Sequence, residues 1–432
     1  MRKKGIIILS SILLLVSLII GASQVYRHNN KSMYTNNLSD VEKTVIYNPT
    51  FLVRDKKKVD LQYLKSYNPK LGIDLINCDL RELDINNKID ILKSASFDLG
   101  TIWPTSLPQS FNPLSILELN KNPGLNVKKI HNQGITGKGV GIAIIDQPLL
   151  TTHQEIKNNL KYYNEINEEI DNSMDHISSE HGTAVASIAA GENIGVAPQA
   201  DLYFIAVSNT VLVNGEMEID HNNEAKAINE IFKINKSLTN KIRVISISNG
   251  WWKGQRGYEE IVQAIQNAKR ENILVVSSSM IDYSGVFFDG LGKDPMGNPD
   301  DIKSYSSSFM YKDDYLNEKN INAFFEKRVL DKFKIKRSIK EILYVPMDSR
   351  TVASPASNDN YNYFSRGGWS FCSPYIAGMY ALSCQVNPKI TPEKFLKEAL
   401  ETGDSIEVKE GNSSYYLNKI INPIKLLEKV KK

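Results

Sequence analysis

Short apolar runs alternate with longer helical stretches over most of the chain beyond Asn122. Four runs rich in β-branched residues are typical of buried parallel strands: VGIAIID, ADLYFIAV, RVISIS and ILVVSSS, at residues 140–146, 200–207, 243–248 and 273–279. Helix-like segments lie at residues 181–190, 225–234 and 258–272. This alternation predicts an α/β fold with a parallel sheet covered by helices. Ligands of such sheets bind beyond the carboxyl ends of the strands.

The first residues have the pattern of an export signal. Basic residues 2–4 precede an uncharged apolar run of 15 residues from Ile6 to Ile20. That length is typical of a signal-peptide core and short for a membrane span. Small residues follow at 21–23. We therefore predict that residues 1–23 are a signal peptide or a retained N-terminal membrane anchor. The rest of the chain is expected outside the cytoplasm, either extracellular or at the cell surface.

Residues 24–118 are predicted to be a linker and an N-terminal extension, either a prodomain or an accessory region. The linker is a polar stretch rich in Asn and Ser. Within the extension Leu75, Leu80 and Ile85 recur every five residues. This spacing resembles a fragment of a pentapeptide-repeat coil, and an ordinary strand-and-turn stretch is the alternative. Residues 119–432 are predicted to form the main domain.

Composition excludes several classes of protein. A hydrophobic content of 41% and a charged content of 23% indicate a globular chain. The net charge of +3, without a dense basic patch, gives no sign of nucleic-acid binding. Three cysteines are too few for a disulfide scaffold. Cys372 and Cys384 are expected on or beside one helix, so we predict buried thiols instead of a bridge.

Three polar residues occupy positions that suit nucleophilic catalysis. Asp146 ends a predicted strand, where a buried carboxylate can orient a histidine. His181 opens the helical segment HGTAVASIAAG and is a candidate general base. Ser370 lies in GGWSFCSPYIAG at the start of a helix, where Pro374 fits the first turn. There its hydroxyl can face a cleft, and its N–H can stabilise an oxyanion. Taken singly, each of the three would more often be a turn or cap residue.

The order Asp, His, Ser is that of the subtilisins. Five segments occur in the order found in the subtilase family: GKGVGIAIID, HGTAVASIAAG, GVAPQADLYFIAV, GGWSFCSPYIAG and NKIINPIKLL. From Asn122 to Leu427 the chain therefore resembles a subtilisin-like serine peptidase of the subtilase (peptidase S8) family. Residues 102–125 resemble a divergent subgroup from low-GC Gram-positive bacteria.

The resemblance implies a three-layer α/β fold with helices on both faces of a mostly parallel sheet. It also implies a serine endopeptidase with Asp146, His181 and Ser370 as a catalytic triad, acting on a peptide or protein through an acyl-enzyme. Substrate would pair with the segment formed by Ser248, Asn249, Gly250 and Trp251. Trp251 stands where the family has a small residue, so it either narrows a subsite or is a buried core residue.

The oxyanion-hole asparagine of the family is not evident. A gap-free match places Met280 or Ile281 at its position, and one inserted residue places Asp282 there. Losing one oxyanion donor costs about 10² to 10³ in turnover. The alternative to an active peptidase is therefore a catalytically impaired pseudopeptidase that binds peptides or proteins.

The proposed chemistry requires no cofactor. Many subtilases bind calcium, and four carboxylates fall in one Gly- and Pro-rich loop: Asp289, Asp294, Asp300 and Asp301. A solvated acidic loop is the alternative to a calcium site. We expect a monomer whose partner is its peptide substrate, with no nucleic acid and with membrane contact only through the N-terminal segment.

Overall fold

The computed structural model describes residues 43–431 with five gaps, at residues 69–70, 167–175, 214–215, 310–340 and 411–412. The predicted signal or anchor at residues 1–23 and the polar stretch predicted to be a linker, at about residues 29–40, lie outside the described residues. No described helix is both long enough and apolar enough to span a membrane.

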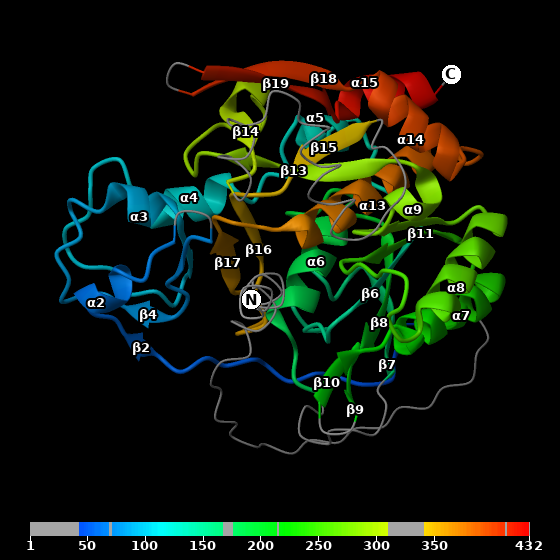
Figure 1. Cartoon of the computed structure of the whole chain (residues 1–432), viewed down its shortest axis with the longest axis horizontal. Helices are drawn as coiled ribbons and strands as arrows, with labels where there is room; N and C mark the ends of the chain where they lie inside the picture. Colours follow the sequence, from blue (N-terminus) through cyan, green and yellow to red (C-terminus); the bar gives the residue numbers. More distant parts are fainter. Residues whose placement is uncertain are drawn as a thin grey trace, which may run out of the picture.

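A six-stranded parallel sheet forms the centre of the molecule (Figure 1). Its order is β1-β7-β8-β6-β11-β12, and every pair of neighbours is parallel. The four strands predicted from the sequence are confirmed: β6 (Gly141–Asp146), β8 (Asp201–Val207), β11 (Ile242–Ile247) and β12 (Leu274–Ser277). The other two strands, β1 (Thr44–Val45) and β7 (Leu160–Ile166), were not predicted from the sequence.

Helices cover both faces of this sheet, so the predicted three-layer α/β fold is confirmed. Alternate residues of β6 point to opposite faces, as the pleat of a strand requires. Ile142 and Ile144 pack in a core cluster with α6 (Glu180–Ala190) and α13 (Trp369–Val386). Ala143 and Ile145 pack in a second cluster, which contains residues of α7 (Asn222–Ser237) and α8 (Tyr258–Arg270).

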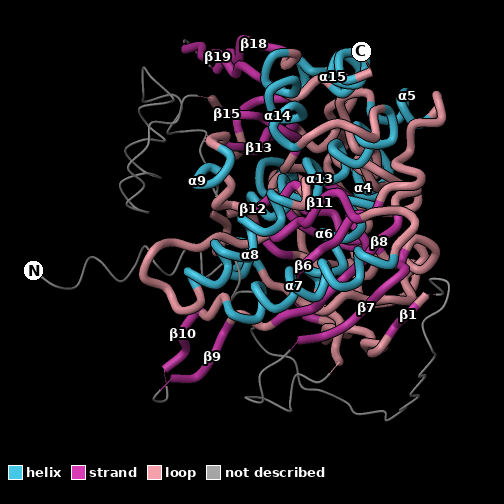
Figure 2. Tube along the Cα trace, turned by 90° about the vertical axis from the view of Figure 1, so that its right-hand side faces the viewer, coloured by secondary structure: helices cyan, strands magenta, loops and turns pink. Residues whose placement is uncertain are grey.

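A second sheet of five strands lies beside the central one, and the sequence analysis did not predict it. Its order is β14-β13-β15-β19-β18. The bounds are β13 Phe287–Lys293, β14 Tyr305–Ser307, β15 Ile342–Pro346, β18 Asp404–Glu410 and β19 Ser413–Ile420. A short hairpin, β9 (Thr210–Val213) with β10 (Glu216–Ile219), projects from the end of the central sheet (Figure 2).

Three further helices share one starting pattern, a side-chain cap followed by proline. They are α4 (Pro113–Leu119), α14 (Pro392–Glu401) and α15 (Pro423–Val430), capped by Asn112, Thr391 and Asn422. Each cap accepts a hydrogen bond from a backbone N–H of the first turn. Proline suits the first position because its fixed φ is helical and no N–H is needed there. The described part of the main domain also contains the short helices α5 (Val127–His131) and α9 (Ile281–Ser284).

The N-terminal extension forms a small lobe of stacked short strands, drawn in blue and cyan in Figure 1. Parallel pairs join residues 21 to 23 positions apart, among them β2 (Lys57–Lys58) with β4 (Cys78–Asp79) and β3 (Ile73–Asp74) with β5 (Ala95–Asp98). Leu75, Leu80 and Ile85 are fully buried in one cluster. The five-residue spacing thus marks the buried side of a parallel coil built from short strands and turns, with α2 (Leu61–Leu64) and α3 (Ile89–Lys93) between them.

The lobe shares a sheet with the rest of the chain. Strand β5 pairs antiparallel with β17 (Tyr361–Phe364), which pairs with β16 (Arg350–Ala353). The rings of Phe97 and Tyr363, one from each strand, lie 4.9 Å apart between centroids. All three cysteines are buried and free, as predicted, and Cys372 and Cys384 lie on the one helix α13.

Candidate active site

Asp146 and His181 meet at the carboxyl end of β6. Nδ1 of His181 lies 2.6 Å from Oδ1 of Asp146. The Asp146 side chain is 5% exposed and that of His181 is 21% exposed. The carboxylate accepts from Nδ1, so this nitrogen carries a proton and Nε2 is free to act as a base.

The start of α6 fixes the position of His181. Ser179 is the N-cap, and its hydroxyl accepts from the His181 N–H at 3.1 Å. The same hydroxyl donates to Gln147, which follows Asp146 in the chain. Gly182 packs so tightly that an added Cβ would lie 2.0 Å from the Gln147 carbonyl oxygen. Only glycine fits there, because the strand end and the helix start are in direct contact.

Burial and charge act in opposite directions on the imidazole. Burial lowers the pKa of His181, but the charge of Asp146 and its hydrogen bond outweigh burial and raise the pKa above its ordinary value. The arrangement stabilises the imidazolium that forms when a histidine takes up a proton.

Ser370 is the second residue of α13, and here the predicted local structure was wrong in one detail. The helix begins at Trp369, preceded by Gly368 with φ +80°, so Pro374 lies inside the helix and not in its first turn. Proline has no N–H to donate to the carbonyl four residues earlier, which belongs to Ser370. The Ser248 hydroxyl donates to that carbonyl at 2.8 Å and replaces the missing hydrogen bond.

The hydroxyl of Ser370 is turned toward β11. Its Oγ donates to the Ser248 carbonyl at 3.3 Å. Among the described residues, no hydrogen bond joins Ser370 to His181. Such bonds are often formed only when substrate is bound. The structure therefore brings Asp146 and His181 together and ties Ser370 to the end of β11.

Two buried carboxylates contact the loop that leads to Ser370, a role that was not predicted from the sequence. The indole N–H of Trp369 donates to Asp289 at 2.8 Å, and Asp289 is fully buried. Asp348 accepts from the Gly367 N–H at 2.9 Å. Burial raises the pKa of Asp348 to about 6. These contacts fix Gly367, which precedes Gly368, and Trp369, which precedes Ser370.

The predicted substrate-pairing segment continues from β11. Ser248, Asn249 and Gly250 are partly exposed, whereas Trp251 is 3% exposed and packs in the core. Of the two alternatives predicted for Trp251, its environment fits the buried core residue. Its backbone N–H and carbonyl both bond to the Ser279 hydroxyl at 2.8 Å.

A polar network beneath this segment was also missed. Asn249 Nδ2 donates to Glu224 at 2.9 Å, and the other carboxylate oxygen of Glu224 lies 2.5 Å from Nδ1 of His221. His221 is fully buried, and its ring lies edge-on to that of Trp251. The network holds the segment from the side away from the surface.

The residues considered for the oxyanion hole occupy the loop after β12. Met280 and Ile281 are buried in the core. Asp282 is half-buried in α9, and its backbone N–H donates to the Ser279 carbonyl. Nearby, Ser278 faces Gly250, whose added Cβ would lie 3.1 Å from the Ser278 Cβ.

Carboxylates of the acidic loop bind donors from elsewhere in the protein. Asp294 pairs with Lys93 at 2.8 Å, and Asp300 accepts from Asn122 and from the Asn126 N–H. Asp301 caps a short 3₁₀ helix, residues 302–304. In the part of the chain that the structure describes, no group of three or more His, Cys, Asp or Glu side chains could hold a metal ion.

Comparison with known proteins finds a matching family model and relatives that are named serine proteases. A family model described as the subtilase family matches residues 137–305, a range that includes Asp146 and His181 and ends before Ser370. The major intracellular serine protease of Bacillus subtilis (strain 168) is 26% identical over 279 residues, covering 62% of this chain and 76% of the relative.

Two further relatives are similar. Subtilisin NAT of Bacillus subtilis subsp. natto is 25% identical over 300 residues, or 68% of this chain and 67% of the relative. A probable subtilase-type serine protease of Deinococcus radiodurans is 24% identical over 348 residues, or 74% of this chain but only 43% of the relative's length.

A solved structure, the prenylagaramide maturation protease PagA, aligns over 70% of this chain and 98% of its own with a TM-score of 0.43 and 16% identity. The family match, the serine-protease relatives and the six-stranded parallel sheet agree with the five sequence segments described above. Together these findings support a subtilisin-like peptidase of the subtilase (S8) family, whose model matches residues 137–305 of this chain.

Proposed function

We propose that the protein is a serine endopeptidase with Asp146, His181 and Ser370 as its catalytic triad. The observation that carries the proposal is the 2.6 Å contact between Asp146 and His181, at the carboxyl end of a parallel strand. A buried carboxylate that holds Nδ1 leaves Nε2 available as a base.

In the proposed reaction Nε2 of His181 takes the Ser370 proton as Oγ attacks a peptide carbonyl. Asp146 stabilises the imidazolium. His181 then gives the proton to the leaving amine, and water hydrolyses the acyl-enzyme with His181 again as base. The Ser370 hydroxyl must first leave the Ser248 carbonyl, a rotation about one side-chain bond.

The substrate is proposed to be an extended peptide that pairs with Ser248, Asn249 and Gly250. These residues are partly exposed beside Ser370. We also propose that the Ser370 N–H contributes to an oxyanion hole, with Asp282 or a nearby serine as its second donor.

A pseudopeptidase that binds peptides without cutting them is the second candidate. Two observations favour it. Ser370 bonds to Ser248 instead of His181, and the buried Met280 and Ile281 offer no side-chain donor to an oxyanion.

Labelling with a fluorophosphonate probe tests the first candidate against the second. We expect covalent modification of Ser370 in the wild-type protein and none in Ser370→Ala, read by mass spectrometry of the digest. Absence of label from a wild-type protein with native circular dichroism would support the pseudopeptidase.

We further propose that the protein acts as a monomer outside the cytoplasm, without a cofactor. The support for export is the basic start and the 15-residue apolar run of the sequence. Expression of the full chain followed by fractionation, with sequencing of the new N-terminus, distinguishes a cleaved signal from a retained anchor.

A further inference from the structure

Residues 43–54 of the extension, here called the N-terminal strap, run along the main domain toward α6. Strand β1 of the strap pairs with β7 and forms an edge of the central sheet, as Figure 2 shows. Farther along, the Thr50 N–H donates to the His176 carbonyl at 2.7 Å, and the Ser178 N–H donates to the Thr50 carbonyl at 3.0 Å. The strap therefore pairs with the residues that lead directly into the cap of α6.

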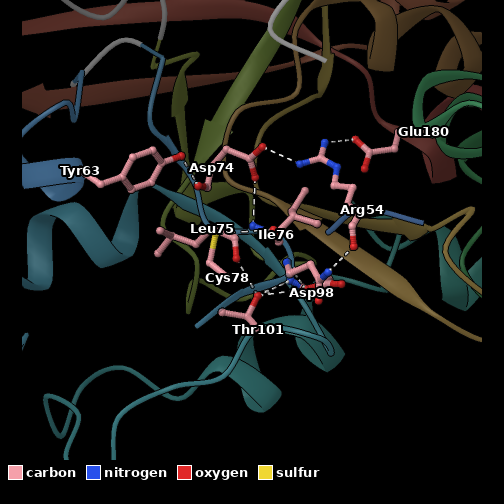
Figure 3. Close-up of polar contacts among 10 residues, drawn as sticks. Arg54, Tyr63, Asp74, Leu75, Ile76, Cys78, Asp98, Thr101 and Glu180 are labelled. Carbon is pink, nitrogen blue, oxygen red and sulfur yellow. Dashed lines mark hydrogen bonds and ion pairs between the residues drawn. The ribbon is translucent and has the colours of Figure 1, made fainter. Parts of the chain in front are cut away.

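Arg54 ends the strap and joins two carboxylates from different parts of the molecule (Figure 3). One guanidinium nitrogen lies 2.8 Å from Asp74, in the lobe, and another lies 2.6 Å from Glu180, the first residue of α6. The Glu180 side chain is 5% exposed and that of Arg54 is 27% exposed. The ion pair with Glu180 is thus largely shielded from water, where one planar guanidinium can hold two carboxylates in fixed directions.

Contacts within the lobe hold Arg54 in place independently of its contact with α6. The Asn77 side-chain amide donates to the Arg54 carbonyl at 2.6 Å, and the Asn77 N–H donates to Asp98 at 2.8 Å. Asp74 accepts in addition from the Ile76 N–H at 3.0 Å. The guanidinium is therefore presented to Glu180 by a hydrogen-bonded turn of the lobe and not by a freely rotating side chain.

Glu180 and His181 are consecutive residues at the start of α6, so fixing the first constrains the second. Burial raises the pKa of Glu180, and Arg54 opposes that effect. Without Arg54 a buried carboxylate would lack its cation and would have to take a proton or move toward water. In either case the ion pair that links the lobe to the first turn of α6 is lost, and the cap of that turn sets the His181 backbone.

We propose that Arg54 is a positioning residue for His181, acting through Glu180, and that the extension that supplies it remains part of the active enzyme. The inference rests on the proposed peptidase function. It runs against a prodomain that is removed on maturation, because cleavage with release of the lobe would take Arg54 from the start of the catalytic helix.

The test uses the full chain, with turnover of a peptide substrate and fluorophosphonate labelling as readouts. Arg54→Met is expected to lower kcat/KM at least tenfold, with the loss mainly in kcat, because the peptide-pairing segment is untouched. Arg81→Met is the matched control. Arg81 pairs with Asp79 at 2.7 Å in the same lobe, but its side chain is 65% exposed and does not contact α6. We expect wild-type kcat from it.

A double variant separates positioning from stability. Replacing both charges, in Arg54→Met with Glu180→Leu, removes the unpaired buried carboxylate and is expected to restore the melting temperature. If Arg54 positions His181, kcat stays low in this folded protein. Recovery of kcat together with the melting temperature would show that Arg54 only compensates a buried charge, and the inference would be wrong.

The intact mass of the labelled wild-type protein gives the second readout. We expect the labelled species to contain residues 43–104. Labelled, active protein that begins after Arg54 and has lost the lobe would overturn the inference while leaving the peptidase function standing. A wild-type protein that neither labels nor turns over would instead remove the proposed function, and the inference with it.

Discussion

The carbonyl of Ser370 lacks its usual helical donor because Pro374 stands four residues later in α13. Ser248 supplies the donor from the end of β11, and the Ser370 hydroxyl donates back to the Ser248 carbonyl. A proline that would weaken an ordinary helix here leaves one carbonyl for a strand to bind. Two reciprocal hydrogen bonds therefore fix the position of the proposed nucleophile relative to the proposed peptide-pairing segment.

Ser248→Ala is predicted to destabilise the protein by about 1–3 kcal/mol, because the Ser370 carbonyl would be left without a donor. Urea unfolding followed by circular dichroism measures this. The control is Ser237→Ala, which removes an exposed hydroxyl bonded to the Ile234 carbonyl and is expected to cost less than about 0.5 kcal/mol. Equal effects of the two variants would contradict the role given to Ser248.

The pH dependence of kcat/KM follows from the environment of His181. The base must be neutral, so activity rises as pH passes through its pKa. Asp146 raises that pKa, and the acidic limb of the wild-type profile is therefore expected above pH 6.5.

In Asp146→Asn the charge is lost while burial remains, so the acidic limb moves to lower pH. Turnover is expected to fall by about 10⁴, because the amide favours the wrong tautomer. If the acidic limb of the kcat/KM profile stays at the same pH in this variant, Asp146 does not raise the pKa of His181 and its assigned role is wrong.

At the scale of elements, prediction succeeded where a strand is buried on both faces. The runs that became β6, β8, β11 and β12 are continuous and apolar, so burial alone identifies them. Strand β7 was missed because Lys161, Asn164 and Glu165 interrupt its apolar residues, and β1 because two residues make no pattern. The lobe was left undecided, because its strands are held by residues more than 20 positions away.

The stability of the lobe is predicted to depend strongly on Leu80. Leu80→Ala is predicted to cost about 2–5 kcal/mol, because Leu80 is fully buried between stacked strands. Leu99→Ala, at a side chain that is 53% exposed, should cost less than about 0.5 kcal/mol. Thermal unfolding of both variants measures the difference, and a small effect at Leu80 would mean that the lobe is loosely packed.

At the scale of the molecule, the sequence singled out Asp146, His181 and Ser370 as candidates but not what surrounds them. Local motifs reveal a strand end and two helix starts, and the order of the three residues indicates a common site. No local pattern shows that Arg54 meets Glu180 or that Asp289 lies under Trp369, since 126 and 80 positions separate them. Such contacts depend on tertiary packing, which single-sequence periodicity does not contain.

The hydrogen bonds of the acidic loop, residues 289–301, lead to a prediction about calcium. Asp294 and Asp300 bind protein donors, and a calcium ion on this loop would have to displace those donors. EDTA is expected to leave both kcat/KM and the melting temperature unchanged. A melting temperature that falls on chelation and returns with added calcium would reveal a site that this loop does not explain.

The pairing of β5 with β17 has a consequence for how the chain folds during synthesis. Phe97 and Tyr363 are partners in that ladder, so most of the polypeptide must leave the ribosome before the lobe can complete its sheet. Contacts that are this distant in sequence slow folding. Until then β5 presents an unpaired edge, which invites association with other chains. A nascent chain stalled before residue 361 would keep that edge open, whereas the finished protein covers it with its own strand.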